Sequence, residues 1–353
     1  MSYPSTQSSY NVAENFVLWD FFIQREDECY MTVRHWQHVE EVHLLDYKKF
    51  LDHGIPITTQ ASLPANTAVL IQAVGEKQLE GVYVQKLKAI RPLTNKSAPN
   101  RDLRLYLDAI SNPDITMLAI DGLMGSGKTS TIIKHLIEEN LKDVKLDRSS
   151  PDEPKHSRAE RPRSFKMPVD GEKKLNKEGT AKRKVLIAKP YVNASGEEYG
   201  FLPGDIDQKF DPTLENFIQY FNRWHPAGYD LLKLNGYIDV MPLGFIRGMD
   251  VENMDIVADE CQNTNELISL ATRKANNSRI FFLGDTSPFQ IDRVGNTPKK
   301  NGLRDLIDLL QGAPYFQYIE MQSLEHIVRS YETKDIVRRL FKKHGEDPKE
   351  WVI

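Results

Sequence analysis

Residues 122–130 (GLMGSGKTS) carry the clearest chemistry in this 353-residue chain. They fit the template G-x-x-x-x-G-K-[ST], in which glycines let the backbone turn tightly and point N–H groups at phosphate oxygens. The lysine of such a loop reaches the β- and γ-phosphates of a nucleotide, and the Ser or Thr hydroxyl holds Mg²⁺. We therefore predict a phosphate-binding loop formed by Gly122, Leu123, Met124, Gly125, Ser126, Gly127, Lys128, Thr129 and Ser130.

Two adjacent carboxylates, Asp259 and Glu260, follow the apolar residues 256–258 in the segment IVADECQN (residues 256–263). Ligands of open α/β sheets bind at the carboxyl ends of strands, so this is a suitable place for chemistry. Asp259 suits the coordination shell of a metal, and Glu260 suits a base that activates water. An Asp-Glu pair favours hydrolysis over a small-molecule kinase, because a kinase must avoid activating water. A nucleotide-dependent adaptor protein is the other alternative.

In the segment FFLGDTSPFQID (residues 281–292), an apolar run is followed by Gly284 and Asp285, and Gln290 comes five residues later. A polar side chain at the tip of a strand beside the phosphate site can contact the γ-phosphate and report its loss. We interpret Gln290 as such a sensor, with an ordinary strand-end turn as the alternative.

Strand-like and helix-like segments alternate after residue 101, which predicts how these motifs are positioned. Continuous apolar runs predict buried strands at 114–121, 183–191, 253–260, 278–285 and 315–321. Apolar residues at helical spacing predict helices at 129–141, 214–224, 264–274, 303–312 and 332–344. Buried strands separated by helices indicate a mostly parallel sheet covered on both faces, the α/β fold of a P-loop NTPase.

Composition changes along the chain divide it into parts. We predict a flexible N-terminus at 1–12, a small β-rich domain at 13–93, and the P-loop domain at 94–353. Residues 142–184 have few large apolar side chains and more Lys and Arg than Asp and Glu, which predicts a disordered basic insertion. A solvated loop is the favoured interpretation of this insertion, and an arm that contacts nucleic acid is the alternative.

The overall composition is that of an ordinary soluble chain. Hydrophobic residues make up 40% of it, and the net charge is −4. This charge argues against a protein that coats nucleic acid by charge alone, although a local basic groove remains compatible with it. The two cysteines, Cys29 and Cys261, suit a reducing cytoplasm, and the longest apolar runs are too short to span a membrane. We expect a cytoplasmic protein without a membrane anchor.

Five segments in this order resemble the PhoH-like ATPases, relatives of superfamily 1 helicases: GLMGSGKTS, GFLPGDIDQKFDPTL, VMPLGFIRGMDVEN, IVADECQNTNE and GDTSPFQID. The resemblance covers roughly residues 100–340, and "GFLPGD" and "IRGMD" are not general P-loop features. It implies a core that binds ATP and Mg²⁺ and hydrolyses ATP. It also implies a homo-oligomeric ring that acts on RNA or another single-stranded nucleic acid, with helicase-like activity.

The resemblance assigns roles by position in this sequence. Lys128 and Thr129 bind phosphate and Mg²⁺, Asp259 and Glu260 form the metal-binding and hydrolytic pair, and Gln290 senses phosphate. Arginines of the family fall at Arg247, Arg273 and Arg329. Arg329 and then Arg247 are the preferred candidates for an arginine finger that reaches a nucleotide across a subunit boundary, with a surface salt bridge as the alternative for each.

Three positions depart from the family pattern. Leu103 stands where many relatives carry a Gln that reads adenine, which bears on selectivity for ATP. Two more residues than usual separate Asp285 from Gln290, which bears on the sensor role. Lys189 stands where an Arg is common.

Overall fold

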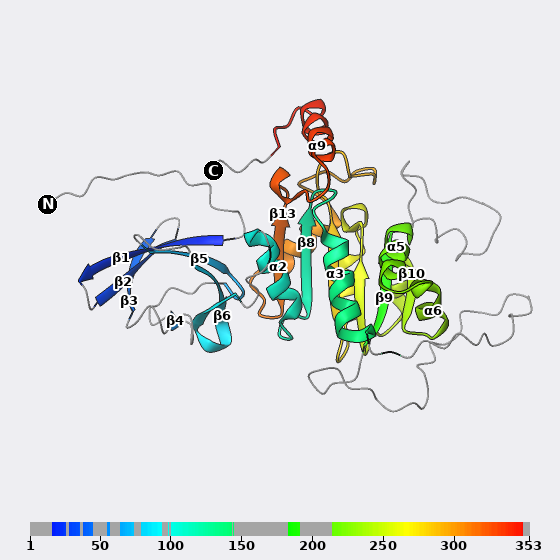
Figure 1. The fold of residues 1–353 in the computed structure, drawn as a ribbon, viewed down its shortest axis with the longest axis horizontal. Helices are drawn as coiled ribbons and strands as arrows, with labels where there is room; N and C mark the ends of the chain where they lie inside the picture. Colours follow the sequence, from blue (N-terminus) through cyan, green and yellow to red (C-terminus); the bar gives the residue numbers. More distant parts are fainter. Residues whose placement is uncertain are drawn as a thin grey trace, which may run out of the picture. The chain divides into compact units, whose positions relative to one another are not determined.

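The chain forms two β-sheets and a set of helices in its computed structural model (Figure 1). The residues that the structure describes are 16–25, 28–35, 38–44, 55–56, 64–73, 79–93, 98, 100–142, 144, 183–190 and 214–348. The predicted flexible N-terminus at 1–12, the insertion apart from its two ends, and the GFLPGD segment therefore lie outside the described residues. No helix of the described part is long and apolar enough to cross a bilayer.

The first sheet has seven strands in the order β3-β2-β1-β5-β6-β7-β4. β1 pairs antiparallel with β2 and parallel with β5, and the remaining pairs are antiparallel. This sheet confirms the β-rich N-terminal part predicted from the sequence. The strand bounds are β1 Phe16–Arg25, β2 Glu28–His35, β3 His38–Leu44, β4 Ile55–Pro56, β5 Ala68–Ala73, β6 Leu79–Val84 and β7 Ala89–Pro92.

The second sheet has six strands in the order β10-β9-β11-β12-β8-β13. The pairs β10–β9, β9–β11, β11–β12 and β8–β13 are all parallel, as expected for strands joined by helical crossovers. The sheet confirms the predicted P-loop NTPase α/β fold. Its strands are β8 Met117–Gly122, β9 Lys184–Lys189, β10 Ile238–Pro242, β11 Met254–Ala258, β12 Arg279–Gly284 and β13 Phe316–Met321.

Helices follow most of these strands. The α-helices are α2 Arg101–Ser111, α3 Lys128–Leu136, α5 Glu215–Trp224, α6 Gly228–Leu234, α7 Leu267–Ala271, α8 Gly302–Leu310 and α9 Tyr331–Lys343. Shorter turns are the 3₁₀ segments η1 Gln85–Leu87, η4 Leu243–Gly248, η5 Cys261–Asn263 and η6 Leu324–His326, and the π segment η2 Ile137–Leu141 that continues α3.

The helix predicted at 264–274 is shorter than expected, because its C-terminal part joins a β-bridge. The structure has α7 only at Leu267–Ala271. Lys274 pairs with Val251, whose N–H donates to the carbonyl of Arg273 and whose carbonyl accepts from Ala275. A non-local partner thus takes the backbone groups that would have continued the helix. Helices α2 and α6 and strand β10 were not predicted.

Contacts between residues divide the chain into two compact units. Unit 1 is residues 1–126, 287–289 and 307–353, and unit 2 is residues 127–286 and 290–306. The boundary between the units falls between Ser126 and Gly127. Within unit 1, ion pairs join α2 to the first sheet, since Arg91 binds Asp108 at 2.7 Å and the Arg104 Nε donates to Glu80 at 2.6 Å. The core of unit 2 is built on β9, β11 and β12, whose apolar side chains are buried.

Candidate nucleotide site

The first half of the glycine-rich loop leaves β8 and is held by backbone hydrogen bonds within unit 1. The Leu123 N–H donates to the Met321 carbonyl at 3.0 Å, and the Ser126 N–H donates back to Leu123 at 3.1 Å. Gly125 has a φ of 80°, a left-handed conformation that a residue with a Cβ adopts only with strain. Its carbonyl accepts from the Val328 N–H at 3.0 Å. The loop is therefore tied to the segment after β13.

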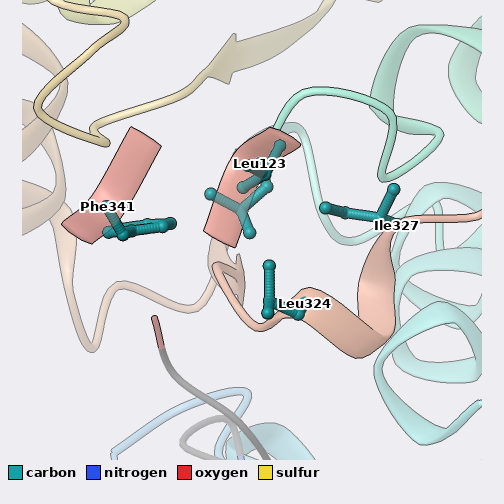
Figure 2. Close-up of a cluster of buried hydrophobic side chains, with 5 residues drawn as sticks. Leu123, Leu324, Ile327 and Phe341 are labelled. Atoms are coloured by element: carbon teal, nitrogen blue, oxygen red, sulfur yellow. The ribbon is translucent and has the colours of Figure 1, made fainter. Parts of the chain in front are cut away.

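An apolar cluster anchors the same half of the loop, and Figure 2 shows its side chains. Leu123 is fully buried with residues of η6 and α9, and Met124 and Phe289 pack against the group. The ring of Phe289 meets that of Phe341 edge-on, with centroids 5.0 Å apart. The cluster consists of Leu123, Leu324, Ile327, Val337 and Phe341. A large apolar residue at a variable position of the loop thus serves as its anchor.

The second half of the loop begins α3 in unit 2. Gly127 caps the helix with a φ of 84°, and Lys128 is the first helical residue. The Thr131 N–H donates to the Gly127 carbonyl at 3.0 Å, and the Ser130 hydroxyl donates to the same carbonyl at 3.0 Å. The first turn of a helix leaves backbone N–H groups without helical partners and carries partial positive charge. Such an end suits an anionic ligand.

The two carboxylates lie at the end of β11, as the sequence predicts. The Asp259 N–H donates to the Ala188 carbonyl at 2.9 Å, which continues the pairing with β9. Asp259 is buried, and its Oδ2 lies 3.4 Å from the Nζ of Lys189. Glu260 has a φ of 55°, a strained left-handed conformation for a residue other than glycine.

Burial raises the pKa of Glu260 above its ordinary value, and the neighbouring Asp259 raises this pKa further. Lys189, the hydrogen bond from Gln262 and Lys128 lower it in turn. A carboxyl with a raised pKa is a stronger base when ionised, and nearby cations keep it available in that form. Lys128 of the loop therefore acts electrostatically on Glu260.

Gln262 and Asn263, which the sequence analysis did not single out, form a hydrogen-bond network around Glu260. The Gln262 amide donates to Glu260 at 2.7 Å and to the Gln290 carbonyl at 3.0 Å, and its oxygen accepts from the Asp285 N–H at 3.0 Å. Asn263 also donates to the Gln290 carbonyl, at 3.2 Å, and accepts from the Asp292 N–H at 2.8 Å. The polar residues that follow Glu260 in the sequence are the feature from which such a network could have been predicted.

A buried His–Asp pair holds the segment that carries Arg329. The Ser323 N–H donates to Nδ1 of His326 at 3.1 Å, so Nε2 carries the ring proton and donates to Asp102 at 2.8 Å. Three residues further on, the aliphatic stem of Arg329 lies against the loop: a Cβ placed on Gly125 would be 3.1 Å from the Arg329 Cδ. Asp102 and His326 are 224 positions apart, so no sequence pattern pointed to this pair.

Part of the chain matches a known protein family. Residues 173–340 match the family described as "PhoH-like protein". This match and the curated relatives named PhoH-like protein or PhoH2 support membership of the PhoH-like family. It is 32% identical to the PhoH-like protein of Mycobacterium tuberculosis (strain ATCC 25618 / H37Rv) over 44% of this chain and 43% of that protein. It is 22% identical to Protein PhoH2 of Mycolicibacterium smegmatis over 78% of this chain and 56% of that protein.

Protein PhoH2 of Bacillus subtilis is 32% identical over 37% of this chain and 31% of its own length. The chain thus spans about half or less of the length of these curated relatives. The family match begins at residue 173, after the glycine-rich loop, so the loop is recognised by its own sequence and geometry. Family and fold together make the chain a P-loop NTPase-like protein and support nucleotide binding.

The structure places the other predicted site residues as follows. The carbonyl of Gln290 is bound by Gln262 and Asn263, and its side chain is half-buried. Arg329 and Arg273 are exposed. Arg247 lies in η4, and its side chain is outside the described residues. The assigned roles of these residues stay predictions.

The residues of the loop fit a bound phosphate chain. The Ser126 hydroxyl is buried and has no hydrogen-bond partner among the described residues, as expected for a donor reserved for a ligand. A Cβ on Gly122 would come within 2.9 Å of Met321 and of the Ser126 hydroxyl, so only glycine fits there. Thr129 and Asp259 supply a hydroxyl and a carboxylate oxygen, which are the ligands that Mg²⁺ prefers.

Proposed function

We propose that this PhoH-like protein hydrolyses ATP and couples hydrolysis to binding or remodelling RNA or another single-stranded nucleic acid. The observation that carries the hydrolysis proposal is Glu260, a carboxyl with a raised pKa that borders Asp259 and responds to the charge of Lys128. A small-molecule kinase must avoid activating water, so a base of this kind beside a second carboxylate favours hydrolysis. The coupling to nucleic acid rests on the family resemblance.

Glu260 would accept the proton of the attacking water. Its strained backbone and the 2.7 Å hydrogen bond from Gln262 fix the carboxylate in one orientation. The second carboxylate oxygen remains for the water, because Gln262 binds Oε2. Positioned general bases contribute about 10²–10⁴ to a rate.

Lys128 and the N–H groups at the start of α3 would bind the phosphates and neutralise their charge. Thr129 and Asp259 would hold Mg²⁺, which supplies further neutralisation of the β- and γ-phosphates when bound. Arg329 would contribute positive charge from beside Gly125. It either serves the loop of its own chain or completes the site of a neighbouring chain in a homo-oligomeric ring.

The hydrogen bonds of Gln262 and Asn263 support a route by which hydrolysis is transmitted. Both side chains hold residues 290–293, so a change in the orientation of Glu260 alters this segment. The segment continues into an exposed stretch with Arg293, Lys299 and Lys300. Such positive charge suits the phosphate backbone of a nucleic acid.

The test is an ATPase assay with and without single-stranded RNA and DNA, made with two variants. Lys128→Ala should lose nucleotide affinity, because the cation that faces the phosphates is gone. Glu260→Gln should bind nucleotide as the parent does and lose about 10²–10⁴ in turnover. Parental turnover by Glu260→Gln would refute the assignment of the base. Low turnover that neither RNA nor DNA changes would favour an adaptor.

Mixing variants tests the ring. If Arg329 serves a neighbouring site, mixed rings of Arg329→Ala and Glu260→Gln chains regain activity, because an intact site then meets an intact arginine. Co-purification of two differently tagged variants must first show that mixed rings form. Mixed rings without recovered activity would assign Arg329 to its own chain, and a monomer at working concentrations would refute the ring.

A further inference from the structure

Lys189 is a buried lysine that acts on Glu260 and also forms an ion pair with Asp259. It is the last residue of β9, and its side chain is 10% exposed. The register of β9 and β11 pairs Ala188 with Ala258. The residues that follow this pair, Lys189 and Asp259, therefore lie side by side. The Nζ of Lys189 lies 3.4 Å from the Asp259 Oδ2 and 5.8 Å from the ring centroid of the buried Phe217.

A lysine is seldom buried unless an opposite charge compensates for the loss of water. Here the compensating charge is Asp259, the residue predicted to bind Mg²⁺. The ammonium group therefore stands beside the same carboxylate that a divalent cation would use. Two cations that share one buried carboxylate repel each other, so metal binding at Asp259 must weaken the contact with Lys189.

We infer that Lys189 is the resident counter-ion of Asp259, a positioning residue that couples metal entry to nucleotide entry. Without nucleotide, the ammonium neutralises Asp259 and opposes a divalent cation. With nucleotide, phosphate oxygens offer the ammonium a new partner, and Asp259 becomes available to the metal. This role rests on the proposed function, because it presumes that Asp259 is a metal ligand of a nucleotide site.

The test measures Mn²⁺ binding to the full chain by electron paramagnetic resonance, without nucleotide and with ADP. Lys189→Met keeps the length of the stem and removes the charge, so it should bind Mn²⁺ on the order of tenfold more tightly than the parent without nucleotide. The difference should shrink when ADP is present. Lys189→Arg, which keeps the charge, should stay within about twofold of the parent, since one charge-assisted contact is retained.

Two controls keep the result interpretable. Adding Asp259→Asn to Lys189→Met should abolish the gain, which assigns the bound Mn²⁺ to this carboxylate. Circular dichroism checks folding, and Lys189→Gln replaces Lys189→Met if the latter does not fold. Unchanged or weaker Mn²⁺ binding by the uncharged variant would overturn the inference. Binding of a fluorescent ADP analogue to the parent is measured separately, and its absence would refute the proposed function and leave the nucleotide-free comparison valid.

Discussion

Protonation of His135 should destabilise the protein as the pH falls. His135 lies on α3, the helix that begins at Lys128, and its Nε2 has no hydrogen-bond partner among the described residues. Burial, followed by the positive charges of Arg279 and Arg183, lowers the pKa of His135 from its ordinary 6.5 to about 3. The folded state therefore keeps the ring neutral over a range in which the unfolded chain takes up a proton.

The sign and size of the effect follow from this difference. A lowered histidine pKa means that stability is complete above the unfolded pKa of 6.5 and is lost as the pH falls from there towards 3. At pH 5.5 the unfolded state is favoured by about 1 kcal/mol more than at pH 7.5 through this one group. A change of that size lowers Tm by roughly 2 °C in a chain of 353 residues, because the entropy of unfolding grows with chain length.

His135→Gln, which does not titrate, isolates the contribution of the histidine from that of every other group. Thermal unfolding of both proteins is followed at pH 7.5 and pH 5.5 by circular dichroism. The parent should lose roughly 2 °C more than the variant between the two conditions. An equal loss in both proteins would refute the reasoning, because the ring would then not be held neutral by its buried, positively charged surroundings.

Three further predictions concern the site. Gln262→Ala should keep nucleotide affinity and lower turnover by about tenfold, because Glu260 loses the donor that orients it; unchanged turnover would contradict this. Asp102→Ala should lower Tm and weaken nucleotide binding, because the proton on the His326 Nε2 loses its acceptor. Asp102→Asn retains an acceptor oxygen and should behave more like the parent. Equal behaviour of the two variants would show that the His326–Asp102 pair does not support the loop. Gly125→Ala should abolish binding of a fluorescent nucleotide. The matched control is Gly295, which has a φ of 87° and no atom within 4 Å of an added Cβ. Gly295→Ala should lose only about 1 kcal/mol of stability. Normal nucleotide binding by Gly125→Ala would show that the strained turn is dispensable.

The predicted strands and most predicted helices correspond to observed elements because their signal is local. The continuous apolar run before Gly122 and the helical spacing after Lys128 gave β8 and α3 directly. The bounds of elements with a weaker local pattern depend on contacts with residues far away in the sequence. The predicted helix at 264–274 ends early because Val251 pairs with Lys274, which no local pattern announces.

The sequence by itself predicted the phosphate-binding loop and the Asp259–Glu260 pair and determined the parallel α/β architecture, because glycine conformation, carboxylate chemistry and hydrophobic period are properties of neighbouring residues. Only the tertiary structure decided that Lys189 neutralises Asp259 and that Gln262 holds Glu260 and the Gln290 carbonyl. The same holds for His326 and Asp102. Gln262 and Glu260 are near neighbours in sequence, but the other partners are brought together by the fold across longer stretches of chain, and the register of β9 and β11 sets Lys189 beside Asp259. Strand register depends on the packing of the whole sheet, so contacts of this kind cannot be predicted from a local sequence pattern.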